Sequence, residues 1–174
     1  MLPMVRNLIN LLRIFVMRGS FSSETKPSHW FVVFLDFDGV THSGTSGTMR
    51  LLPKIEALLE KYPNAKVVIC SNWKASESLE SLRGWFSAGF AHRVIGVTPD
   101  LPDGPASRQD EIEAWLSKNP TEFWCALDDT ATLYRRNCPW LILTDSRQGV
   151  SDANLAQLEN LLIAASAKAS EARN

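Results

Sequence analysis

The feature that most constrains the fold is a run of five apolar residues, 31–35, that leads directly into two aspartates and a glycine. A continuous apolar run of this length, rich in Val and Phe, predicts a strand buried on both faces. Asp36 and Asp38 follow where that strand must end. Ligands of open parallel sheets bind outside the carboxyl ends of the strands. Two carboxylates this close repel each other unless a cation lies between them, and oxygen ligands favour Mg²⁺. The alternative interpretation is a simple acidic turn, since Asp and Gly are common turn residues.

The rest of the chain alternates between strand-like and helix-like patterns. Apolar runs predict further strands at residues 66–70, 93–97, 123–127 and 140–143. Helices are predicted to begin at Pro53, Ser76, Ser107 or Arg108, and Ser151 or Asp152, with the second ending near Phe86. Strands that alternate with helices of this length imply a parallel sheet with helices on both faces. We therefore expect an α/β fold, a three-layer sandwich around five strands.

Polar side chains of complementary types lie at the ends of these strands or at the start of the third helix. They are Asp36, Asp38, Ser71, Asn72, Lys74, Arg108, Asp128 and Asp129. The carboxyl ends of parallel strands share one edge of the sheet, so we expect these side chains to meet there. Carboxylates from two strands can share one Mg²⁺, while hydroxyl, amide and cationic groups bind an anion beside it, for which phosphate is the natural ligand. Singly, each motif is more simply a turn, a helix cap or a solvated residue, and their joint occurrence in order favours a site.

Together these motifs resemble those of a known superfamily. Residues 35–40 (Leu-Asp-Phe-Asp-Gly-Val), 71–72 (Ser-Asn), Arg108 and 127–129 (Leu-Asp-Asp) resemble the four motifs of the haloacid dehalogenase (HAD) superfamily. Residues 71–74, 96–99, 111–112, 115–116 and 144–145 are similar to a small capless HAD group, which includes the HAD domains attached to RNA-repair proteins. That group usually has Arg at the position of Lys74, which here loses a planar bidentate donor. The resemblance implies a Rossmann-like sheet of order 5-4-1-2-3 without a cap domain.

The resemblance also implies a division of roles within the site. Asp36 would attack phosphorus and form an aspartyl-phosphate, and Asp38 would protonate the leaving oxygen and then activate water. Mg²⁺ would bind Asp36, the backbone carbonyl of Asp38, and Asp128. Asp129 would be a further metal ligand or would orient Arg108. The residues expected to bind the phosphate are Ser71, Asn72, Lys74 and Arg108.

The expected function is a Mg²⁺-dependent phosphohydrolase that acts on a phosphate monoester. Asp38 separates this chain from dehalogenases, which the resemblance implies lack a second acidic residue there. An open, capless site would admit a large substrate, such as a nucleic-acid phosphate end or a phosphoprotein. The main alternative is a non-catalytic HAD-like module that binds Mg²⁺ and a phosphorylated ligand or partner. A receiver domain is more distant, because the third strand ends at residues 96–98 without the Asp that would be phosphorylated.

Two aromatic residues lie close to the motifs and have alternative interpretations. His42 lies in the Gly- and Ser-rich loop after Asp38, and we expect it to be exposed, with substrate contact as the alternative. Trp73 directly follows the Ser-Asn motif. We expect it to pack in the core or at its rim, with stacking on a base or sugar as the alternative.

Length and composition set the remaining expectations. The chain of 174 residues suits one domain, which we place at residues 30–165, followed by a frayed tail at 166–174. Residues 1–29 are an extension or linker, with an amphipathic helix as one form, and their apolar stretch is too short for an integral membrane span. A net charge of −1 gives no sign of general nucleic-acid binding. Three scattered cysteines fit neither zinc nor disulfides and favour a reducing, cytoplasmic setting. The pattern predicts no oligomeric state.

Overall fold

The structure, a computed structural model, describes residues 28–44 and 46–171. The predicted extension at residues 1–29 therefore lies almost entirely outside the described residues. Its last two positions belong to the first strand, which begins at Ser28. None of the described helices combines the length and the apolar character needed to cross a bilayer.

The centre of the fold is one parallel sheet of five strands. The strands are β1 (Ser28–Leu35), β2 (Ala65–Ile69), β3 (Val94–Val97), β4 (Thr121–Asp128) and β5 (Leu141–Leu143). Their order is β3-β2-β1-β4-β5, which is the predicted order counted from the other edge. All four pairings are parallel, with Leu35 level with Ile69 on one side and Leu127 on the other. β1 is thus the middle strand, and the prediction of an α/β sandwich is confirmed.

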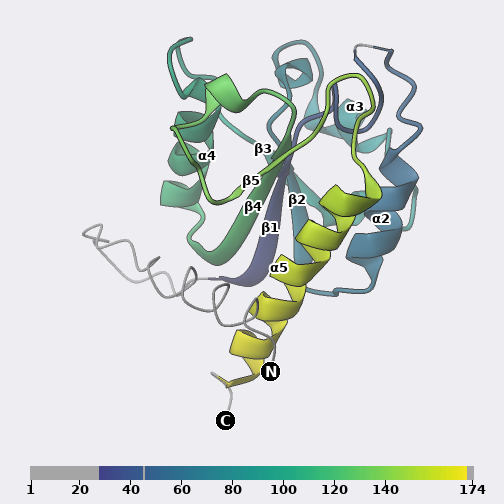
Figure 1. Cartoon of the computed structure of the whole chain (residues 1–174), viewed down its shortest axis with the longest axis vertical. Helices are drawn as coiled ribbons and strands as arrows, with labels where there is room; N and C mark the ends of the chain where they lie inside the picture. Colours follow the sequence, from purple (N-terminus) through teal and green to yellow (C-terminus); the bar gives the residue numbers. More distant parts are fainter. Residues whose placement is uncertain (1–27, 45, 172–174) are drawn as a thin grey trace.

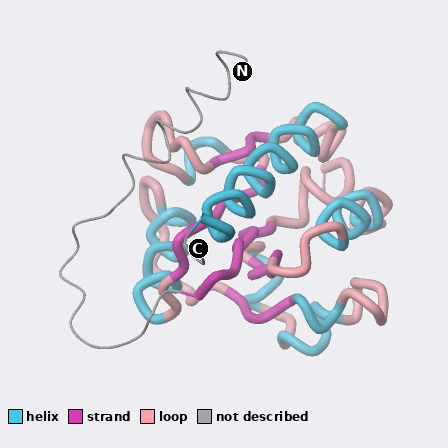
Figure 2. The backbone as a smooth tube through the Cα atoms, turned by 90° about the horizontal axis from the view of Figure 1, so that it is seen from below, coloured by secondary structure: helices cyan, strands magenta, loops and turns pink. Residues whose placement is uncertain are grey.

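Helices cover both faces of this sheet, as the alternating pattern predicted (Figures 1 and 2). They are α2 (Leu52–Glu60), α3 (Leu79–Arg83), α4 (Ser107–Lys118) and α5 (Asp152–Glu171). Along β1, Val33 and Leu35 pack in the core with α2 and α5, whereas Val32 and Phe34 pack with Ile112 of α4. Successive strand residues point to opposite faces, so both sides of β1 must be apolar. In the described residues, the segments after β1 and β3 are loops, and neither carries a cap domain.

One predicted helix was wrong in its bounds, and the last helix is longer than its leucine pattern indicated. The helix predicted at residues 76–86 is a 3₁₀ turn, η1 (Asn72–Ala75), followed by the short α3. The Ser71 hydroxyl accepts from the backbone amide of Trp73 and the Ser78 hydroxyl from that of Ser81, so each serine begins a separate helical segment. Local side-chain bonds of this kind compete with a continuous helix. α5 continues to Glu171, beyond the predicted domain end at residue 165. Ala165 is buried and the Lys168 ammonium lies 5.7 Å from the centre of the Phe123 ring, so the added turns pack on the domain.

Candidate functional site

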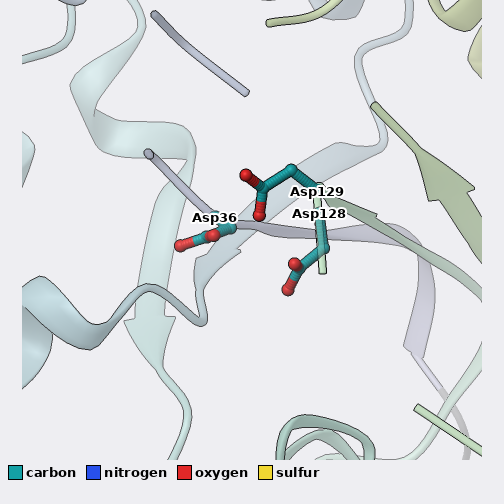
Figure 3. Close-up of side chains that lie close together, drawn as sticks. All are labelled: Asp36, Asp128 and Asp129. Carbon is teal, nitrogen blue, oxygen red and sulfur yellow. The ribbon is translucent and has the colours of Figure 1, made fainter. Parts of the chain in front are cut away.

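Three aspartates converge at the carboxyl edge of the two central strands (Figure 3). Asp36 follows β1, Asp128 ends β4, and Asp129 comes next. The backbone amide of Asp36 donates to the carbonyl of Leu127 at 3.0 Å, which continues the pairing of the two strands up to the site. One ligand atom from each carboxylate lies within 4.8 Å of the others. The strand order therefore brings together the acidic residues that the sequence placed at separate strand ends.

Burial is the largest cause of raised pKa values in the two innermost carboxyl groups, those of Asp36 and Asp128. It raises the pKa of Asp36, against the opposing effects of Arg108 and Ser71, and the charge of Asp129 raises it further. Burial also raises the pKa of Asp128 to about 7, with Asp36 adding to the shift and Arg108 opposing it. A carboxyl group that is costly to ionise becomes easy to ionise beside a cation. The oxygen-only donor set and its unfavourable negative charge fit a divalent ion such as Mg²⁺.

Two neighbours hold Asp128 and Asp129 in place. Tyr134 donates its hydroxyl to one oxygen of Asp128 at 2.9 Å, and the amide of Thr130 donates to the other at 2.8 Å. The Thr130 hydroxyl donates to Asp129 at 2.6 Å. Tyr134 was not predicted from the sequence. It lies six residues after Asp128, at the end of a 3₁₀ turn, and belongs to no motif. Such bonds to a ligating carboxylate fix the direction of its free lone pairs.

Gly39 is the residue that lets the chain leave the site. Its φ of +66° lies in the left-handed region, where a side chain is strained. A Cβ at this position would overlap the carboxylate of Asp129. Its carbonyl accepts a 2.7 Å hydrogen bond from the hydroxyl of Thr144, one of the residues that carried the resemblance. Only glycine allows Asp129 to lie this close to the turn.

We expect Gly39→Ala to weaken Mg²⁺ affinity by displacing Asp129, and to cost roughly 1–2 kcal/mol in backbone strain. Gly44→Ala is a matched control, because Gly44 also has a positive φ, +52°, but has open space around its Cβ position. The measurements are Mg²⁺ titration calorimetry and the free energy of unfolding in urea. Equal Mg²⁺ affinities in the two variants would show that the approach of Asp129 to Gly39 has no part in metal binding.

A buried arginine lies beside the carboxylates. Arg108, in the first turn of α4, is only 4% exposed. Its Nη2 donates to the side-chain oxygen of Asn72 at 3.0 Å, and its Nε lies 3.7 Å from Asp128. Its Nη1 has no hydrogen-bond partner among the described residues. A buried donor left unpaired is costly, so Nη1 is suited to donate to an anionic ligand at this site.

The other predicted phosphate ligands are placed in different ways. Ser71 is buried, and its side chain hydrogen-bonds to Asp36. Asn72 accepts from Arg108 and so orients it, while the ammonium of Lys74 lies 2.6 Å from Asp100 and 3.2 Å from Glu111. The two carboxylates neutralise Lys74, and this placement gives no support to the phosphate-binding role predicted for it. Its contacts join η1 to the loop before α4, through Asp100, and to α4 itself, through Glu111.

The expectation that His42 is exposed was wrong. Its side chain is completely buried, because the loop after Asp38 folds back into the domain instead of extending into solvent. Trp73 packs partly buried against the core beside Phe37, with ring centres 5.5 Å apart, which agrees with the packing interpretation. Both side chains contact the carboxylate of Asp38. This contact had no signal in the sequence.

Comparison with known protein families now adds to the geometry. The family described as the HAD domain in Swiss Army Knife RNA repair proteins matches residues 32–155, well over half of the chain. The chain belongs to this family, and so to the HAD superfamily, whose members are generally hydrolases. Comparison with curated proteins gave no match, and comparison with solved structures gave none either.

Proposed function

We propose that the protein is a Mg²⁺-dependent phosphatase that hydrolyses a phosphate monoester through an aspartyl-phosphate. The observation that carries the proposal is the pairing of a buried carboxylate cluster with a buried guanidinium whose Nη1 is unpaired. The carboxylate cluster fits a divalent cation, and the guanidinium fits an anion. A site that holds a phosphate ester beside Mg²⁺ needs both kinds of group. The ion would be held by Asp36, Asp128, Asp129 and the backbone carbonyl of Asp38. It would reduce the repulsion between nucleophile and substrate.

In the first step, a carboxylate oxygen of Asp36 forms a bond to phosphorus. The bond between phosphorus and the leaving oxygen breaks, and its electron pair goes to that oxygen, which takes a proton from Asp38. Arg108, through Nη1, and Ser71, whose hydroxyl proton turns from Asp36 to the substrate, bind the non-bridging phosphoryl oxygens. The hydrogen bond that Arg108 donates to Asn72 and its ion pair with Asp128 hold the planar guanidinium in one orientation.

In the second step, water attacks phosphorus and gives a proton to Asp38, which now acts as the base. The bond between phosphorus and Asp36 breaks, its electron pair returns to the carboxylate, and inorganic phosphate is released. Asp38 ends the cycle with its proton restored. The two aspartates of the opening motif thus have separate tasks, Asp36 as nucleophile and Asp38 as proton carrier.

The substrate we propose is the phosphate end of a nucleic acid. The family description names RNA repair proteins, and the described loops after β1 and β3 leave the sheet edge without a cap. A large substrate can approach an open site, whereas a cap selects small ones. The net charge of −1 makes binding through a general basic surface a poor explanation, so recognition of the phosphate end itself would have to provide most of the affinity.

The test is a panel of monoesters measured with Mg²⁺ and with a chelator in its place. It contains a generic aryl phosphate, oligoribonucleotides with a 3′- or a 5′-phosphate, and a phosphoserine peptide. We expect Mg²⁺-dependent release of inorganic phosphate, fastest with one of the two oligonucleotides. Release that continues in chelator would contradict the metal-dependent mechanism, and no release from any member would contradict the assignment as a phosphatase.

A further inference from the structure

Both oxygens of the Asp38 carboxyl group contact side chains to which the resemblance assigned no role. The Nε2 of His42 lies 2.9 Å from Oδ1, and the indole Nε1 of Trp73 donates to Oδ2 at 2.9 Å. We infer that His42 and Trp73 are positioning residues, which aim the carboxyl group of Asp38 at the leaving oxygen. This inference rests on the proposed function, because it assigns the two residues to the proton transfer of that reaction.

We call the two contacts of His42 and Trp73 with Asp38 the Asp38 clamp. The need for it follows from the rotational freedom of an aspartate side chain. Rotation about the last side-chain bond of Asp is broad, so one hydrogen bond leaves the plane of the carboxyl group poorly defined. Two bonds to different oxygens define that plane. The side chain of Asp38 is still 35% exposed, so the clamp leaves it open to a substrate. Proton transfer depends on a donor within hydrogen-bond reach and correctly directed, which the clamp provides before substrate binds.

His42 is itself fixed from its other side. Its Nδ1 lies 3.0 Å from the hydroxyl of Thr41, and that hydroxyl donates to the carbonyl of Phe37 at 3.0 Å. Both side chains are fully buried. Buried polar groups are stable only when hydrogen-bonded, so this chain of contacts determines the orientation of the ring as well as its place. The segment from Phe37 to His42 therefore closes on itself around Asp38.

Trp73 connects the same carboxyl group to the phosphate side of the site. It lies two residues after Ser71, within η1, and its backbone amide donates to the Ser71 hydroxyl at 3.5 Å. Its ring packs edge-on against Phe37, and Trp85 packs against it with ring centres 5.8 Å apart. The proton donor and a phosphate-binding residue thus share one rigid support. That arrangement places the acid relative to the phosphoryl group rather than only stabilising the loop.

A positioning role predicts a dependence on the leaving group. An alkoxide is a poor leaving group and needs a proton as the bond to phosphorus breaks, whereas an activated phenolate leaves without one. Misdirecting Asp38 should therefore slow alkyl phosphates far more than activated aryl phosphates. A purely structural defect would lower the rates of both by the same factor.

The experiment measures kcat/KM for Mg²⁺-loaded protein with p-nitrophenyl phosphate, phenyl phosphate and a simple alkyl phosphate. The variants are Trp73→Phe, which keeps an aromatic ring and removes the donor, and His42→Leu, with Trp85→Phe as the matched aromatic control. We expect Trp73→Phe and His42→Leu to lower kcat/KM for the alkyl phosphate by about 10- to 100-fold and for p-nitrophenyl phosphate by less than about 3-fold. His42→Gln, whose amide can reach Asp38, should recover part of the loss. Trp85→Phe should resemble wild type for all three.

Equal losses across the three substrates in Trp73→Phe would overturn the inference while leaving the proposed phosphatase intact. The same holds if Trp85→Phe shows the leaving-group dependence as strongly as Trp73→Phe. If His42→Leu fails to fold, shown by its thermal melt, Trp73→Phe still decides the outcome. Failure of the proposed function looks different: wild-type protein would then release no phosphate from these three substrates or from the phosphorylated oligonucleotides of the panel.

Discussion

Replacing Asp36 by Asn should reduce phosphate release by roughly 10⁴-fold or more, as losses of catalytic nucleophiles do. The amide has nearly the shape of the carboxylate but cannot form the aspartyl-phosphate. Folding should not suffer, because burial already makes ionised Asp36 unfavourable. The measurements are kcat with the best substrate of the panel, and the thermal melt of the same samples.

Asp152→Asn is the matched control for this substitution. Asp152 is an exposed aspartate at the start of α5, so the chemical change is the same but lies outside the candidate site. We expect it to keep wild-type activity. Activity retained in Asp36→Asn would exclude that residue as the nucleophile. If wild type and Asp36→Asn both bind a phosphorylated ligand and neither hydrolyses it, the non-catalytic module would be favoured instead.

The parts of this fold that were predicted correctly are those that local pattern determines. The apolar run of β1 requires burial on both faces, and a strand of that kind belongs inside a parallel sheet. Leu35 pairs with Leu127 where β1 and β4 lie side by side. Asp36, directly after β1, and Asp128, at the end of β4, must therefore lie at the same level. The parallel sheet followed from the strand pattern, whereas the strand order that brings the carboxylates together came from the resemblance.

The parts that were missed depend on contacts between distant segments. His42 was expected to be exposed because its loop is rich in small polar residues, yet its burial depends on how that loop closes over the core. The contact between Trp73 and Asp38 spans 35 positions, and no periodicity encodes it. The contacts of Lys74 with Asp100 and with Glu111 of α4 likewise join separate segments, and no local pattern encodes them. Local sequence specifies such side chains but not their partners.

The stability of the metal-free protein should fall as pH rises from about 4 to about 7, and Asp128 should be a main cause. Its pKa of about 7 in the folded protein exceeds its ordinary value of 3.8 because it is buried. Between these values the folded state keeps a proton that the unfolded state releases. The stabilisation is therefore fully present below about pH 4 and is lost as pH rises through about 7. The shift corresponds to a ceiling of about 4 kcal/mol, at 1.36 kcal/mol for each pKa unit.

Urea unfolding of metal-free protein across this pH range, beside Asp128→Asn, gives the measurement. The variant cannot ionise at this position, so its free energy of unfolding should fall less steeply than that of wild type. Saturating Mg²⁺ should restore wild-type stability near neutral pH, because a cation favours the ionised carboxylates, and should do so much less in Asp128→Asn. Parallel pH profiles for the two metal-free proteins would mean that Asp128 ionises normally in the folded state. With the expected result, the carboxylate that weakens the metal-free fold near pH 7 is also one that Mg²⁺ binding would stabilise. The gain in unfolding free energy on adding Mg²⁺ should therefore grow as pH rises over this range.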